Sequence, residues 1–161
     1  MDDPGRRERA IALWRQAYAH HMRQELDEAV RLYMESLALD PTAEAHTFLG
    51  WAYSSQGRLD EAIAECHKAI ALDPDFGNPY NDIGVYLIEQ GNLDRAVPWL
   101  EKAKRAPRYE PRHFPFMNLG RIYLRRGQWQ QALHELEAAA RLAPTDPGAR
   151  KLLHEIRARL N

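Results

Sequence analysis

The chain has 161 residues, of which 45% are hydrophobic and 28% charged, with a formal net charge of −1 and a single cysteine. This length fits one domain with an ordinary core, and the near-zero net charge gives no general attraction to nucleic acid. One cysteine excludes an intrachain disulfide, and no run of about 18 apolar residues exists that would cross a membrane. Because the start of the sequence has no apolar core of signal-peptide length, we expect a cytoplasmic protein without a membrane anchor.

Charge is distributed unevenly along the chain. Residues 1–80 carry 8 Lys and Arg against 14 Asp and Glu, a net of −6, whereas residues 81–161 carry 14 against 9, a net of +5. Two halves of opposite sign favour either the steering of a polar partner or head-to-tail contact between copies of the chain.

In chain order, the sequence alternates apolar segments at helical spacing with short turns. Asp3 and Pro4 have the residue types of a helix cap and a first helical position. Pairs of segments of about 14 residues follow, which the spacing of their apolar side chains predicts to be helices. Turn residues join the two members of each pair at Gln24, Gly57, Gly91 and Gly127. We therefore expect four helical hairpins, at about 10–42, 43–76, 77–112 and 113–146.

The last segment, at about 147–160, has an apolar stripe formed by Ala149, Leu152, Ile156 and Leu160 and an opposite face rich in cations. An amphipathic helix of this kind covers the open end of a stack of hairpins. We therefore expect a capping helix and a single domain over residues 1–161.

A small residue recurs at the same place in the first helix of each pair: Ala17, Gly50, Gly84 and Gly120. Where two helices cross closely, only a small side chain lets the backbones approach. The second helices are expected to fill these crossings with Tyr33, Cys66, Leu100 and Leu136. Cys66 is accordingly predicted to be a buried, inert thiol rather than a nucleophile or a metal ligand.

The stretch RAPRYEPRHFPF, residues 105–116, interrupts this pattern with three prolines. The pattern resumes directly after it, so the stretch is predicted to be an inter-repeat turn lengthened by two residues and not a domain boundary. Pro115 is expected in the first turn of the next helix, where proline is tolerated. Pro98, by contrast, lies inside a predicted helix, where we expect a mild distortion.

The repeat resembles the tetratricopeptide repeat (TPR). Residues 43–74, AEAHTFLGWAYSSQGRLDEAIAECHKAIALDP, follow the family pattern almost throughout, and IGVYLIEQGNLDRA and LGRIYLRRGQWQQA carry it in the third and fourth units. The first unit departs from it, with Gln16–Ala17 in place of an apolar residue and glycine. The resemblance implies an all-α solenoid of four tetratricopeptide-type hairpins, whose first helices line a concave groove for an extended peptide or a partner helix.

Helical spacing around the small residues indicates which side chains face this groove. The expected ligand-binding residues are Trp14, Tyr18, Phe48, Trp51, Asn81, Asp82, Val85, Met117, Asn118, Arg121 and Arg125. The aromatic residues predict an apolar contact at the N-terminal end, and the asparagines and arginines predict contacts to a peptide backbone and to an acidic group. The same positions also allow Trp14 and Trp51 to pack between units, and the sequence leaves both arrangements open.

The chain is thus predicted to be a non-catalytic protein-interaction module, an adaptor or scaffold that needs no cofactor and no metal. No metal-ligand spacing, phosphate-binding loop or nucleophile with a base is recognisable in the sequence. A basic stretch is formed by Lys102, Lys104, Arg105, Arg108 and Arg112. Helix-end cations and a solvated turn account for these residues, so nucleic acid is not expected as a partner. The alternative is a scaffold that forms homo-oligomers through its acidic and basic halves.

Overall fold

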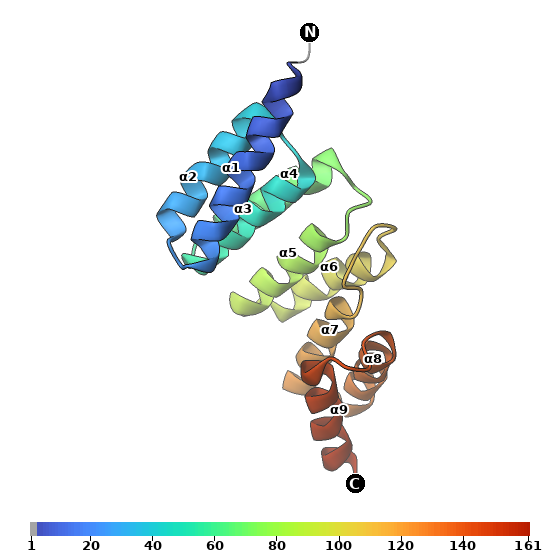
Figure 1. Cartoon of the computed structure of the whole chain (residues 1–161). Helices are drawn as coiled ribbons and strands as arrows, with labels where there is room; N and C mark the ends of the chain where they lie inside the picture. Colours follow the sequence, from blue (N-terminus) through green and yellow to red (C-terminus); the bar gives the residue numbers. More distant parts are fainter. Residues whose placement is uncertain (1–2) are drawn as a thin grey trace.

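The computed structural model describes residues 3–161, and over this range its regular elements are helices (Figure 1). Their bounds are α1 (Pro4–Met22), α2 (Leu26–Leu39), α3 (Ala43–Ser55), α4 (Leu59–Leu72), α5 (Asn78–Glu89), α6 (Leu93–Arg105), α7 (Phe114–Arg125), α8 (Trp129–Leu142) and α9 (Pro147–Leu160). The first eight form four hairpins in succession, and α9 packs on the last of them. The predicted all-α class is confirmed. The first helix begins at Pro4, six residues before the expected start of the first unit.

The hairpins stack into a curved solenoid. Successive first helices contact one another, α1 with α3, α3 with α5 and α5 with α7, and α9 continues the series against α7. Over residues 3–161, successive second helices make no comparable contact. A stack that is close along one side and open along the other curves, so α1, α3, α5 and α7 line its concave side.

Turns and caps explain where the helices begin and end. The four predicted turn residues, Gln24, Gly57, Gly91 and Gly127, all have positive φ, between 62° and 81°. Gln24 departs from the family glycine here, and a residue with a Cβ atom tolerates this conformation less well than glycine does. The Thr42 and Asp146 side chains accept hydrogen bonds from the free amides at the starts of α3 and α9.

The core is concentrated at the crossings inside the hairpins. Tyr33, Cys66, Leu100 and Leu136 are all completely buried, as the sequence predicts. A Cβ atom on Gly84 would lie 2.5 Å from Leu100 Cδ2, and one on Gly120 would lie 2.6 Å from Leu136 Cδ2. Glycine is therefore required at these two crossings because a leucine side chain lies directly against the helix backbone.

The lengthened turn, residues 106–113, which we call the extended segment, lies along the turn between α4 and α5, where Arg108 forms an isolated β-bridge with Phe76. The amide of Gly77 donates to the carbonyl of Arg108 at 2.9 Å, and the amide of Arg108 donates to the carbonyl of Asp75 at 3.0 Å. Tyr109 is buried beside Gly77, where any Cβ would lie 2.5 Å from that of the tyrosine. This docking, which the sequence did not indicate, ties the third inter-repeat connection to the second.

Two prolines of this region lie within helices. Pro115 occupies the first turn of α7, as predicted, and α6 continues through Pro98 without ending there. The Glu110–Pro111 peptide bond is cis.

Candidate binding surface on the concave side

Four aromatic side chains from α1 and α3 form one cluster on the concave side. Trp14 stacks on Tyr18 with ring centroids 5.7 Å apart, and Phe48 meets Trp14 edge-on at 4.8 Å. Phe48 also lies 5.9 Å from Tyr18 and 5.9 Å from Trp51. Tyr18 and Trp51 remain 38% and 40% exposed, while Trp14 and Phe48 are half-buried beneath them. The cluster therefore presents two aromatic faces to solvent on a base of two more rings.

His21 supports Trp51 from below. Its ring centroid lies 4.2 Å from that of Trp51, and the residue is 1% exposed. Ser55 Oγ lies 3.2 Å from His21 Nε2, and the Ser55 hydroxyl also donates to the carbonyl of Trp51, so Ser55 links His21 to the backbone of Trp51. Burial lowers the pKa of His21, which keeps the imidazole neutral. The spacing around Ala17 does place His21 on the inner face, but sequence reasoning did not identify it as a support for the aromatic cluster.

The polar residues farther along the concave side form a linked row. Asn118 Nδ2 donates to Asn81 Oδ1 at 3.0 Å, and Arg121 Nη1 donates to Asn118 Oδ1 at 2.9 Å. Both asparagines are buried. This corrects the expectation that they present their amides to a peptide backbone, because they use them mainly to join α5 to α7. Arg121 is exposed at the end of the row, held in place by Asn118.

The remaining predicted site residues differ in accessibility. Arg125 is exposed, and Val85 is half-buried against the main core. Met117 is 3% exposed and packs with Ala139 and Ala149, so it is a core residue under the capping helix and not a ligand contact. Its place was misassigned because helical spacing does not indicate where α9 covers α7.

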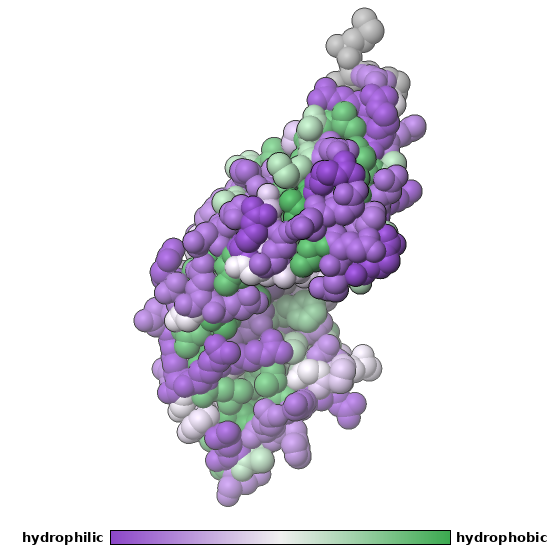
Figure 2. Space-filling model, turned by 90° about the vertical axis from the view of Figure 1, so that its left-hand side faces the viewer, coloured by the Kyte–Doolittle hydropathy of each residue, from purple (hydrophilic) through white to green (hydrophobic). Residues whose placement is uncertain are grey.

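Asp82 is half-buried near the middle of the concave side, one residue after Asn81. Burial raises the pKa of this carboxyl group to about 7, and the neighbouring Asn81 amide lowers it only in part. Over residues 3–161 no cation pairs with its carboxylate, and the Asn81 amide is the one group that lowers its pKa. Figure 2 shows the surface hollowed about midway along the molecule, with hydrophobic residues at the base of the hollow.

The basic stretch near the lengthened turn is mostly engaged within the chain. Lys104 pairs with Glu135 at 2.7 Å and with Glu101 at 3.2 Å. Arg108 pairs with Asp73 and with Glu44, 3.0 Å away. Arg112 donates to the carbonyls of Lys104 and Pro107 near the end of α6. These three cations hold neighbouring elements together and do not form a free basic patch.

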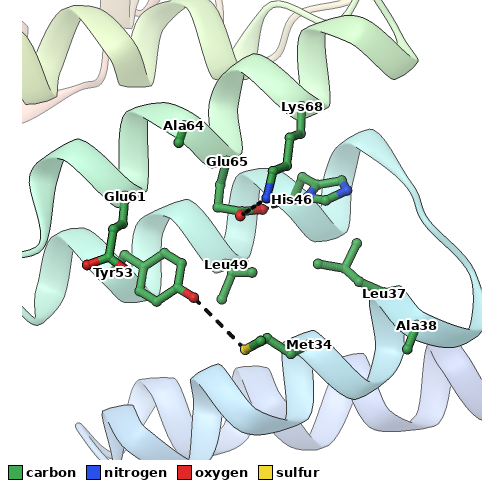
Figure 3. Close-up of a pocket in the computed structure, with 10 residues that line it drawn as sticks. All are labelled: Met34, Leu37, Ala38, His46, Leu49, Tyr53, Glu61, Ala64, Glu65 and Lys68. Atoms are coloured by element: carbon green, nitrogen blue, oxygen red, sulfur yellow. Dashed lines mark hydrogen bonds and ion pairs between the residues drawn. The ribbon is translucent and has the colours of Figure 1, made fainter.

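A second depression, which sequence reasoning missed, lies on the convex side between α2 and α4, with α3 as its floor (Figure 3). It has a volume of about 520 Å³, and both apolar and charged side chains line it. The lining residues are Met34, Leu37, Ala38, His46, Leu49, Tyr53, Glu61, Ala64, Glu65 and Lys68. Glu65 binds both His46 Nδ1 at 2.6 Å and Lys68 Nζ at 2.7 Å. Met34, which lies on a helix face outside the predicted groove, is 53% exposed here.

Neither a metal-binding cluster nor a membrane-spanning helix is found in the part of the chain that the structure describes. Within residues 3–161, no three His, Cys, Asp or Glu side chains are grouped so that they would hold a metal ion. Over the same residues, no helix is both long enough and apolar enough to cross a bilayer.

Comparison with protein families identifies the repeat. Models described as "Tetratricopeptide repeat" match residues 43–76, 80–106 and 114–146, which together make up more than half of the chain. The first hairpin lies outside these matches, in agreement with its departure from the repeat pattern.

Relatives with this repeat come from several kinds of assembly. The type IV pilus assembly protein PilF of Pseudomonas aeruginosa is 28% identical over 146 residues, which are 90% of this chain and 58% of PilF. The anaphase-promoting complex subunit 6 of Dictyostelium discoideum is 30% identical over 132 residues, which are 81% of this chain and 15% of that subunit. The chain thus spans little more than half of the first of these relatives and a small part of the second.

The solved structure of PilF from Pseudomonas aeruginosa superposes on this fold with a TM-score of 0.87 at 26% identity, covering 96% of this chain and 70% of PilF. The curvature and the order of the hairpins are therefore shared over nearly the whole chain.

Proposed function

Because the chain belongs to the tetratricopeptide repeat family, whose fold is a protein–protein interaction module, we propose that it is an adaptor that binds an extended peptide or a partner helix along α1, α3, α5 and α7. The ligand would lie across the first helices, with an apolar side chain at the N-terminal end and an acidic group at the C-terminal end.

The observation that carries this proposal is the aromatic cluster. Tyr18 and Trp51 are large side chains with exposed faces, and their neighbours Trp14, Phe48 and His21 fix their orientation. Aromatic side chains that are ordered before binding lose little conformational entropy when a ligand covers them. Tryptophan and tyrosine are also the residue types that most often dominate binding energy.

The other end of the surface favours an acidic group on the ligand. Arg121 and Arg125 are both exposed on α7 and lie one helical turn apart. Neither has a carboxylate within 4 Å over residues 3–161, in contrast to Arg126, which pairs with Asp94. Two guanidinium groups on one face without a carboxylate partner in the chain suit a carboxylate of a ligand, which they bind through paired hydrogen bonds.

Affinity capture from the native lysate, followed by titration of the purified partner, tests the proposal. We expect the partner to bind Trp51→Ala at least 10-fold more weakly than the wild type, because truncation of a central aromatic anchor costs about 2 kcal/mol or more. Arg121→Ala should weaken binding less and should reduce its dependence on salt.

The matched control is Met34→Ala, since Met34 is a 53% exposed apolar residue on the convex side. This variant should bind like the wild type, and all variants should melt at similar temperatures. Loss of binding in Met34→Ala with unchanged binding in Trp51→Ala would move the site to the depression between α2 and α4.

A further inference from the structure

Asp82 stands apart from the other shielded carboxylates of the chain. Glu65 is buried and binds His46 and Lys68, and Glu135 is buried and binds Lys104. Asp82 has no such cation over residues 3–161, although it is half-buried. A carboxylate that loses part of its hydration without gaining a cation is less stable than a paired one, so Asp82 can still accept a counter-charge.

The surroundings of Asp82 supply no charge to compensate it. The titratable groups close enough to feel its charge are the thiol of Cys66 from α4, the hydroxyl of Tyr86 from α5 and the hydroxyl of Tyr109 from the extended segment 106–113. Burial raises the pKa of all three groups, so they are neutral near pH 7. A cation that reached Asp82 from the open side of the groove would be its only counter-charge.

We propose that Asp82 selects the ligand of the concave groove by pairing with a lysine or arginine side chain of a bound peptide. The inference rests on the proposed function, because it requires a peptide in that groove. It adds a central basic residue to the apolar and acidic ends, so the ligand pattern along α1 to α7 becomes apolar, basic, acidic. The groove presents aromatic side chains on α1 and α3, an anionic side chain on α5 and cationic side chains on α7. A ligand with apolar, basic and acidic residues in this order would match them.

The spacing of the helices sets the spacing of the motif. Packed helices lie about 8–10 Å apart, and an extended peptide advances about 3.3 Å per residue. The apolar residue on Trp51, the basic residue on Asp82 and the acidic residue on Arg121 should therefore follow one another at intervals of about three residues.

A random library of displayed 12-residue peptides, panned on the immobilised full chain, tests this motif and does not require the natural partner. The proteins compared are the wild type, Asp82→Asn, Arg121→Ala and the double variant Tyr18→Ala, Trp51→Ala. We expect the wild type to enrich peptides with Lys or Arg about three residues from an aromatic or aliphatic residue. Asp82→Asn should lose the preference for the cation and keep that for the apolar residue.

One peptide enriched by the wild type is then synthesised with its basic residue intact and with that residue replaced by norleucine. The replacement should weaken binding to the wild type about 10-fold, as measured by fluorescence anisotropy, and should leave binding to Asp82→Asn unchanged. Asp82→Ala serves as a second variant if Asp82→Asn fails to fold, which melting curves and circular dichroism will establish.

The outcomes separate this inference from the proposed function. Enrichment that needs Tyr18 and Trp51 but shows no preference for Lys or Arg, or equal losses with norleucine in both proteins, would overturn the role of Asp82 and leave the groove intact. No enrichment by the wild type over the Tyr18→Ala, Trp51→Ala variant would overturn the groove itself, and the inference with it.

Discussion

At the residue scale, the glycines at the helix crossings set how closely each hairpin closes. We predict that Gly84→Ala destabilises the fold by about 1–3 kcal/mol, because its new methyl group would lie 2.5 Å from Leu100 Cδ2 and 2.6 Å from Leu100 Cγ. Both partners lie on regular helices, so the strain has no flexible chain end to move into. Urea denaturation of the two proteins measures the difference.

A double-mutant cycle with Leu100→Ala isolates the cause. If overpacking against the leucine is the reason, Gly84→Ala should cost clearly less in the Leu100→Ala background than in the wild type. Equal costs in both backgrounds would show that the penalty comes from elsewhere than this crossing.

Asp82 gives a second prediction at this scale, on stability and pH. The carboxyl group has an ordinary pKa of 3.8, and the fold raises it to about 7. The stability that its protonated form contributes is therefore fully present below pH 3.8, is lost as the pH rises from about 4 to about 7, and does not change further above that. A shift of this size would carry about 4 kcal/mol in a fully buried group. Because water still reaches the half-buried Asp82 carboxyl and screens it, Asp82→Asn, which lacks this titration, should gain about 1–2 kcal/mol on the wild type between pH 4 and pH 8.

Urea denaturation of both proteins at pH 4, 6 and 8 checks this gain. Ionisable groups that are common to both proteins cancel in the difference. A constant difference across this range would mean that Asp82 is well solvated in the folded chain.

At the element scale, the extended segment 106–113 shows where burial outweighs ion pairing. Tyr109 is buried with Ala103 and Ala106, whereas the side chain of Arg108 is 52% exposed in its pairs with Glu44 and Asp73. We predict that Tyr109→Ala costs about 3–5 kcal/mol, as for other large buried aromatic residues, and that Arg108→Ala costs at most about 1 kcal/mol.

Chemical denaturation in 0.1 and 1 M NaCl separates the two contributions. Only the effect of Arg108→Ala should shrink in high salt, since exposed ion pairs are screened. A larger loss for Arg108→Ala than for Tyr109→Ala would mean that ion pairs hold the segment in place.

The same elements show how far the sequence predicts the fold. Helix bounds, turns and crossings depend on local spacing, and Gly57, Gly91 and Gly127 together with the buried Leu100 and Leu136 could be read from it directly. The docking of residues 106–113 could not, because it depends on a backbone pairing between Gly77 and Arg108 that no residue type specifies.

The candidate site, too, contains some features that helical spacing predicts and others that it does not. Helical spacing predicted that Trp14, Tyr18, Phe48 and Trp51 share a surface, and their rings are in contact. It did not predict that Asn81 and Asn118 bond to each other, because position on a helix face does not indicate what the neighbouring helix offers. The side chains whose contacts in the structure differ from the predicted ones are those that lie between two helices.

At the scale of the whole molecule, the net charge differs from helix to helix, and not only between the two halves of the chain. The first helix, α1, carries Arg6, Arg7, Arg9 and Arg15 against one glutamate, a net of +3 with its histidines neutral. The last helix, α9, carries Arg150, Lys151, Arg157 and Arg159 against one glutamate, also a net of +3. When the acidic residues just before these helices are included, residues 1–22 carry a net of +1 and residues 143–161 a net of +2, and the excess of acidic residues lies between them.

This arrangement bears on the alternative of a head-to-tail scaffold. Stacking α9 of one copy on α1 of the next would bring two clusters of like charge together, which opposes association, most strongly at low salt. We therefore predict that sedimentation equilibrium gives the mass of a single chain, 18.6 kDa, at both 20 and 300 mM NaCl. The variant Arg150→Glu, Lys151→Glu, which reverses charge at one end, is the matched comparison and should increase self-association at 20 mM NaCl if the repulsion is real. A wild-type mass that rises as salt falls would instead favour the scaffold, with the basic ends of one copy bound to the acidic middle of another.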